Sequence, residues 1–219
     1  MARKARAKEP VPPPLPPGER PTGQLIAEAL RLYGRRFWPS LALGVPVGLF
    51  GALATALHGW TSLLVSITLG SLILTLTYVG AAVIAAERPV PRRRLLVAAV
   101  AGLIAFIPFP ALVLLYVLPA VAWLALVGLA VPAAVIEGTG VVDSLKRGFR
   151  LGRTDYIHSL GTMAALGIVF YLSTRVLGFA LNAGSGQAAD IARPIAEGFL
   201  WPVVVLGASL LYFDQAARL

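Results

Sequence analysis

Arg175 is a charged residue inside a long apolar segment, residues 159–181. If that segment is a membrane-spanning helix, Arg175 lies roughly 24 Å from its start at 1.5 Å per residue. A guanidinium at this depth must reach the headgroups or pair with an acid, and Asp190 and Glu197 are the nearest acids by topology. The same group can hold a phosphate or carboxylate through two hydrogen bonds. Arg175 is therefore a candidate ligand or headgroup site, with snorkelling or an ion pair as the structural alternative.

Hydroxyl side chains form a second candidate site in the apolar segment 61–86. Thr68, Ser71, Thr75 and Tyr78 are separated by three, four and three residues, which places them on one face of an α-helix. Such a stripe can hydrogen-bond to neighbouring helices, at about 0.6 kcal/mol each on average, or it can line a solvated path. The pattern favours packing, and a path for a transported solute is the alternative.

Four cations follow one another closely between two apolar runs: Lys146, Arg147, Arg150 and Arg153. Together with a net charge of +9 and a pI near 10.6, such a cluster would indicate nucleic acid in a soluble protein. In a membrane protein, short basic loops remain in the cytoplasm and face anionic lipid. We therefore expect these side chains to contact phospholipid headgroups and not nucleic acid.

The sequence carries no motif for covalent or metal-assisted chemistry. It has no cysteine, and its two histidines, His58 and His158, fall at predicted span ends on opposite sides of the membrane. The usual zinc, serine-nucleophile and phosphate-binding motifs are absent from the sequence. We expect no catalytic residue, no metal and no cofactor, and an intramembrane enzyme is the third-ranked hypothesis.

The composition indicates an integral membrane protein. Hydrophobic residues make up 58% of the 219-residue chain and charged residues only 13%, with a mean hydropathy of +0.79. Division by length, at about 20 residues per span, predicts six transmembrane helices. The predicted spans are residues 40–57, 61–86, two within 95–136, 159–181 and 194–212.

The segment 95–136 decides the number of spans, because it carries no charge and is too long for one ordinary crossing. Pro108, Pro110 and Pro119 lie near its middle, where a hairpin would turn. Both flanks are strongly basic and should lie on the same side, which requires an even number of crossings. We therefore predict two spans here.

The same charge bias predicts the orientation. In the six-span arrangement, every Lys and Arg except Arg175 and Arg193 lies on the cytoplasmic side, together with both termini. The expected location is the bacterial cytoplasmic (inner) membrane. Residues 1–22 are basic and proline-rich, which predicts a disordered cytoplasmic tail and not a cleaved signal, and residues 23–219 form the polytopic membrane domain.

Two predicted amphipathic helices lie in the membrane interface, each directly before an outward span. Ile26, Leu30, Tyr33 and Phe37 form one apolar face, and Val142, Leu145 and Phe149 form the other. Residues 28–31 match residues 143–146, and 37–41 match 156–160, so an internal duplication and simple convergence both remain open. Gly44 and Gly48 also predict a close helix contact on the first span.

Two segments carry a family resemblance: PAAVIEGTGVVDSLKRGFRLGRTDYIHSLG, residues 132–161, and AEALRLYGRRFW, residues 27–38. They resemble the membrane domain that precedes some bacterial glycerophosphoryl diester phosphodiesterases, and the stand-alone relatives of that domain. Gly148 and the pair Asp155 and Tyr156 depart from the family pattern. The resemblance covers about a quarter of the chain. It implies a six-span fold without catalytic residues of its own, the phosphodiesterase activity belonging to a separate soluble barrel.

The sequence thus predicts an all-α integral membrane protein that acts as a non-enzymatic, lipid-related or membrane-organising module. A small transporter or channel subunit, using the hydroxyl stripe and Arg175, is the alternative from another class. The expected partners are the phospholipid bilayer and its anionic headgroups on the cytoplasmic face. A membrane-protein partner or a second copy of the chain remains open.

Overall fold

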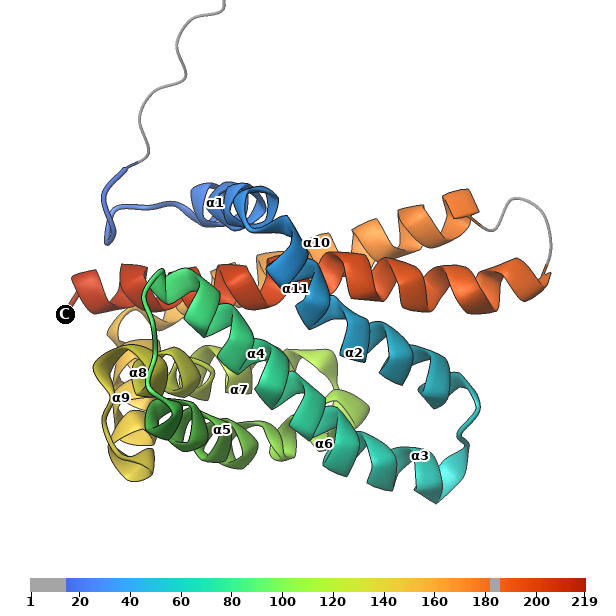
Figure 1. Ribbon diagram of the computed structural model, residues 1–219, viewed down its shortest axis with the longest axis horizontal. Helices are drawn as coiled ribbons and strands as arrows, with labels where there is room; N and C mark the ends of the chain where they lie inside the picture. Colours follow the sequence, from blue (N-terminus) through green and yellow to red (C-terminus); the bar gives the residue numbers. More distant parts are fainter. Residues whose placement is uncertain (1–14, 182–185) are drawn as a thin grey trace, which may run out of the picture.

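The computed structural model describes residues 15–181 and 186–219, and these residues form helices and no strand (Figure 1). The predicted all-α fold is therefore confirmed. The elements are α1 (Thr22–Arg35), α2 (Phe37–Thr55), α3 (Gly59–Val65), the π-helix η1 (Ser66–Gly70), α4 (Ser71–Ala86), α5 (Arg92–Phe106), α6 (Pro108–Leu115), α7 (Val117–Val127), α8 (Ala130–Glu137), α9 (Val141–Thr154), α10 (Tyr156–Leu181) and α11 (Gly186–Ala217).

Six helical segments in the described residues are long and apolar enough to cross a membrane, as predicted. The short elements join end to end, so that α3, η1 and α4 make one span, α5 and α6 another, and α7 and α8 a third. The six spans are Phe37–Ala54, Gly59–Ala86, Arg92–Val113, Val117–Glu137, Tyr156–Ala180 and Ala192–Ala217.

The uncharged segment 95–136 folds as two antiparallel helical segments of spanning length, as predicted. The chain turns at Tyr116, whose backbone is extended (φ −164°, ψ 150°). Tyr116 lies between Pro110 and Pro119, in the region where the turn was predicted. Pro108 begins α6 and Pro119 lies in the first turn of α7, positions where a missing N–H costs little. The hairpin brings Ile136 back to the start of α5. There, Nη1 of Arg94 donates a hydrogen bond to the carbonyl of Ile136 at 3.3 Å.

Helix α11 runs through the molecule and packs against α1, α2, α4 and α10 (Figure 1). Its contact with α2 is made by glycines: a Cβ added to Gly44 would strike the carbonyl of Gly198, and one added to Gly48 would lie 2.8 Å from the carbonyl oxygen of Pro194. Small residues permit this approach of two backbones. The close contact predicted for Gly44 and Gly48 is confirmed, with α11 as the partner helix.

The two predicted helix–span units bend at matching positions. The helix breaks at Arg36 (φ −117°, ψ 45°) between α1 and α2, and at Asp155 (φ −135°, ψ 80°) between α9 and α10. Ser40 and Ser159, which correspond in the two units, are both fully buried and donate their amides to the break residues at 3.0 Å. The packing differs, however, because α2 lies along both α4 and α11, whereas α10 packs on α11 and α7.

The helices α1 and α9 dock on the bundle through faces other than the apolar faces predicted from sequence. In α1 the buried residues are Leu25, Ala29 and Leu32, whereas Leu30 is 51% exposed. In α9 the buried residues are Ser144, Gly148, Leu151 and Gly152, whereas Val142 and Phe149 are exposed. Each helix therefore contacts the protein on one side and leaves apolar side chains exposed on another.

Candidate functional site

The described cations gather at one end of the bundle, here called the basic end. It consists of the turn between α4 and α5, the C-terminus of α8, all of α9 and the C-terminus of α11 (Figure 1). All described Lys and Arg residues lie at or near this end except Arg175 and Arg193. The end that carries the α2–α3 turn is called the opposite end.

Glu137 is the centre of one polar cluster at the basic end. Its Oε1 accepts hydrogen bonds from Nε of Arg147 at 2.8 Å and from the hydroxyl of Tyr212 at 2.7 Å. Arg88 donates to the neighbouring carbonyl of Ile136 at 2.6 Å. These cations meet the carboxyl end of α8, where the helix dipole favours positive charge. The cluster therefore ties the α4–α5 turn, α8, α9 and α11 together.

Asp214 forms a second cluster and is fully buried. Its Oδ2 lies 3.0 Å from Nε of Arg218 and 3.1 Å from Nε2 of His158, and its Oδ1 accepts the backbone N–H of Gly18 at 2.8 Å. Arg218 also pairs with Asp155 at 2.8 Å. A buried carboxylate needs such partners, since an unpaired one is strongly destabilising. The cluster joins the segment before α1 to the start of α10 and the end of α11.

This second cluster involves the segment that the sequence predicts as a disordered tail. Residues 1–14 lie outside the described residues, but Gly18 contacts Asp214 and the position of its absent Cβ lies 3.4 Å from Ala217. Sequence reasoning missed Asp214. Its spacing of four residues from Arg218 is a signal for an ion pair, although nothing in the sequence links that pair to Gly18 or His158.

Of the four residues of α9 that were predicted to bind headgroups, one is engaged within the protein and three are exposed. Arg147 forms an ion pair with Glu137. Lys146, Arg150 and Arg153 are exposed, and the guanidinium of Arg153 lies 5.5 Å from the centre of the Phe149 ring. Three cations of α9 can therefore reach a partner outside the described chain.

The predicted hydroxyl stripe is divided by the π-helix η1. Ser71, Thr75 and Tyr78 are buried, with Oγ of Ser71 donating to the carbonyl of Phe106 at 3.2 Å and Oγ1 of Thr75 donating to that of Ser71 at 2.7 Å. Thr68 is exposed and bonds to the carbonyl of Leu64 in its own helix. The π turn is wider than an α turn, so the residues before it no longer share the face of those after it.

Arg175 lies on the exposed surface of α10. Its guanidinium stacks over the ring of Tyr171, one turn earlier, at 5.1 Å from the ring centre. Glu197, a predicted partner, is instead paired with Arg193 at 2.8 Å. The side chain of Asp190, the other predicted partner, lies outside the described residues. Within those residues, a cation–π contact on its own helix is what holds Arg175.

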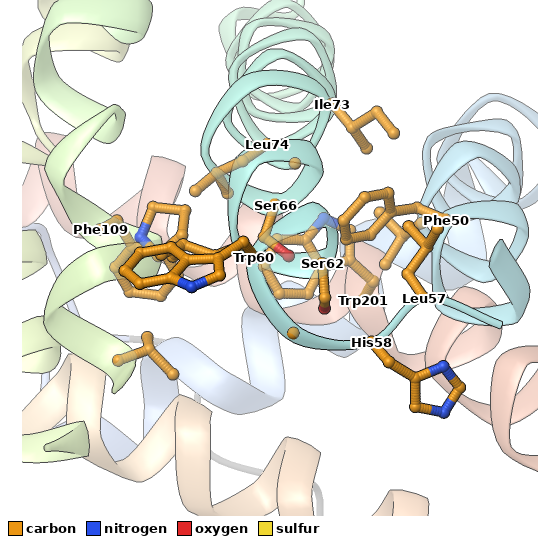
Figure 2. A pocket seen from close by; sticks show the side chains of 16 residues that line it. Phe50, Leu57, His58, Trp60, Ser62, Ser66, Ile73, Leu74, Phe109 and Trp201 are labelled. Carbon is orange, nitrogen blue, oxygen red and sulfur yellow. The ribbon is translucent and has the colours of Figure 1, made fainter. Parts of the chain in front are cut away.

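The opposite end contains a cavity of about 810 Å³ that the sequence did not predict. It lies between α2, the α3–η1–α4 span, α6 and α11, and Figure 2 shows aromatic side chains around it. Aromatic and aliphatic residues in an apolar segment resemble ordinary core residues, so sequence alone gives no signal for a cavity. The lining residues are Val47, Phe50, Leu57, His58, Gly59, Trp60, Ser62, Leu63, Ser66, Gly70, Ile73, Leu74, Phe109, Pro110, Val113 and Trp201.

The exposed cations of the basic end and the apolar cavity of the opposite end could each bind a ligand, and a further hollow of about 810 Å³, lined partly by Arg20, Glu28 and Arg31, lies beside α1. Among residues 15–181 and 186–219, no group of three His, Asp or Glu side chains could hold a metal ion. No family model matches the chain, and neither a curated protein nor a solved structure was found to be similar to it.

Proposed function

We propose that this multi-pass membrane protein is a non-enzymatic, lipid-binding module of the bacterial inner membrane. In this proposal the basic end faces the cytoplasm and binds the anionic headgroups of phospholipids. The observation that carries the proposal is the exposed side of α9, where three cations stand next to exposed apolar side chains. A surface of this kind suits the boundary between headgroups and acyl chains.

The way in which α9 docks supports this proposal. A Cβ added to Gly148 would strike the backbone of Ala130, and one added to Gly152 would lie 2.5 Å from the carbonyl oxygen of Ala125. These glycines hold α9 firmly across the end of the bundle (Figure 1). Lys146, Arg150 and Arg153 therefore project from a fixed platform, and each can contribute about 1 kcal/mol near an anionic surface.

The burial of Ser71 and Thr75 favours this role over the transporter alternative. Both hydroxyls already donate to carbonyls within the chain, at 3.2 and 2.7 Å, and both side chains are fully buried. The Ser71 bond joins α4 to α5, the Thr75 bond stays within α4, and neither hydroxyl faces a solvated path. The resemblance to the phosphodiesterase membrane domain also agrees with a lipid-related function.

The headgroup proposal is tested by counting bound lipids on the detergent-solubilised protein by native mass spectrometry. Phosphatidylglycerol and phosphatidylcholine are titrated against the wild type, the triple variant K146Q/R150Q/R153Q and the control Arg175→Gln. Three charges at about 1 kcal/mol each predict a loss of roughly a hundredfold in affinity for phosphatidylglycerol. The control removes an exposed arginine at the other end and should bind as the wild type does. Equal phosphatidylglycerol affinity in all three proteins would contradict the proposal.

The orientation is tested separately with reporter fusions in cells. Fusions after Arg94 and after Asp155 should both report the cytoplasm, since both positions lie at the basic end. A fusion after Gly59, the first residue of α3, should report the opposite compartment. Reversed signals would place the basic end outside and exclude a cytoplasmic headgroup role.

A further inference from the structure

The cavity at the opposite end has no part in the headgroup proposal, yet it has the size of a ligand site. Its volume of about 810 Å³ falls within the roughly 300–1,000 Å³ typical of small-molecule pockets. Four spans contribute to its wall, and the described residues of that wall include no Asp, Glu, Lys or Arg. A cavity of this composition suits a hydrocarbon and not an ion.

The cavity has the depth of one leaflet of a bilayer. Its lining residues follow one face of the α3–η1–α4 span from Trp60 to Leu74, a rise of roughly 20 Å along the helix. One leaflet, including its headgroup region, is about half of a bilayer thickness of roughly 40–45 Å. Trp60 is 80% exposed and Tyr116, in the turn between α6 and α7, is 78% exposed. Exposed aromatic residues of this kind typically lie at headgroup level, which places the mouth of the cavity there.

The polar groups of the cavity lie toward its mouth. Ser62 and Ser66 are on the helix between Phe50 on one side and Trp60 and Phe109 on the other (Figure 2). The imidazole of His58 is turned away from the two serines in the same view. The site therefore offers hydroxyl donors near headgroup level and carbon surfaces below them, which matches the glycerol ester and the chain of a lipid.

The π-helix η1 shapes this wall. Both Ser66 and Gly70, its first and last residues, line the cavity. A Cβ on Gly70 would lie 3.2 Å from the ring of Phe50, so the glycine leaves room between α2 and this span. Single π turns inside α-helices occur frequently at functional sites. The irregular turn and the cavity are two separate observations that point to the same place.

We propose that the cavity holds one acyl chain of a phospholipid from the leaflet at the opposite end. The ester region of that lipid lies near Ser62 and its chain extends past Ser66 toward Leu74 and Trp201. The surrounding bilayer supplies this occupant, and the depth of the cavity fits its chain. The site is independent of the cations of α9, because it lies at the other end of the bundle.

Tryptophan quenching by brominated phospholipid tests the proposal. A background protein with Trp38, Trp60 and Trp123 changed to Phe retains Trp201 as its one tryptophan, in the cavity wall. In vesicles of phosphatidylcholine brominated along the chain, the fluorescence of Trp201 should be quenched. Adding Ser66→Phe, which fills the cavity, should weaken that quenching at least threefold. Leu76→Phe places the same phenylalanine ring at a 54% exposed position of α4 outside the cavity and should change nothing.

Unquenched Trp201 in the background protein would overturn the proposal without any cavity variant. Equal quenching in the Ser66→Phe and Leu76→Phe proteins would overturn it as well, provided that both retain the helical circular dichroism of the background. Native mass spectrometry identifies the occupant: a retained phospholipid is expected, whereas a retained free fatty acid or other small apolar molecule alone contradicts the proposal. The triple variant of α9, made in the same background, should retain full quenching of Trp201. The acyl-chain proposal and the headgroup proposal are therefore tested independently.

Discussion

The two ends of the bundle are held together by different interactions. At the basic end, side chains far apart in sequence meet in hydrogen bonds and ion pairs of 2.6–3.1 Å, such as Gly18 with Asp214 and Tyr212 with Glu137. At the opposite end, most of the described polar contacts stay within one helix or one turn, such as Arg193 with Glu197 and Thr61 with the carbonyl of His58, although Trp201 donates to the hydroxyl of Thr77 on α4 at 3.2 Å. Long-range polar contacts are therefore concentrated at the basic end, and apolar packing predominates at the opposite end.

This difference matters because the surroundings are lipid. Apolar side chains gain little by leaving an acyl-chain environment for a neighbouring helix, so packing between helices must come from close fit and hydrogen bonds. The basic end has such hydrogen bonds, and its own hollow of about 810 Å³ beside α1 is lined partly by charged residues such as Arg20 and Glu28, whereas the cavity at the opposite end is apolar. The molecule thus combines an end held by polar contacts with an end whose helices leave room for a lipid chain.

Among substitutions that test the difference between the two ends, Asp214→Ala should have the largest effect on stability. The substitution leaves Arg218, His158 and the N–H of Gly18 without their buried partner. Removal of one member of a buried ion pair typically costs about 3–5 kcal/mol. We expect a marked fall in the thermal unfolding temperature of the detergent-solubilised protein, measured by circular dichroism.

The matched control is Glu197→Ala at the opposite end. Glu197 also pairs with an arginine four residues away, but the side chain of Arg193 is 71% exposed, although that of Glu197 is only 16% exposed. Exposed ion pairs contribute at most about 1 kcal/mol. If the two variants lose similar stability, the contrast between a polar and an apolar end is wrong.

The fold was largely predictable because a bilayer fixes the length of its spanning helices. The first and second spans begin two or three residues from their predicted starts, and the uncharged segment 95–136 divides as its basic flanks require. The turn itself is at Tyr116 and not at a proline, since Pro108 and Pro119 are both accommodated at the starts of helices. Span number follows from length and charge, whereas the turning residue depends on local packing.

The side-chain clusters were less predictable, for two physical reasons. Helical periodicity is preserved when a face is shifted by one residue, so α1 docks through Leu25, Ala29 and Leu32 although Ile26 and Leu30 have the same spacing. The π turn of η1 places Thr68 on a different face of the span from Ser71 and Thr75. No residue type predicts such a turn from sequence. Contacts between distant segments, such as Gly18 with Asp214, leave no periodic signal at all.

A smaller effect is expected from Gly48→Ala, which tests whether close packing maintains α2 against α11. The added methyl would lie 2.8 Å from the carbonyl oxygen of Pro194, which is backbone and cannot rotate away. Overpacking of this kind typically costs about 1–3 kcal/mol. Gly167→Ala in α10 is the control, because its methyl would meet nothing within 4 Å.

The comparison of these two glycines sharpens the contrast between the ends. Gly48 lies beside Val47 and Phe50, so moving α2 from α11 also moves the wall of the cavity. We expect Gly48→Ala to lower the unfolding temperature and to change the quenching of Trp201 by brominated lipid, with Gly167→Ala altering neither. The contacts of Asp214 lie at the other end and should survive in both variants. If Gly48→Ala is as stable as Gly167→Ala, the opposite end does not depend on close glycine packing, and the basic end alone determines the arrangement of the spans.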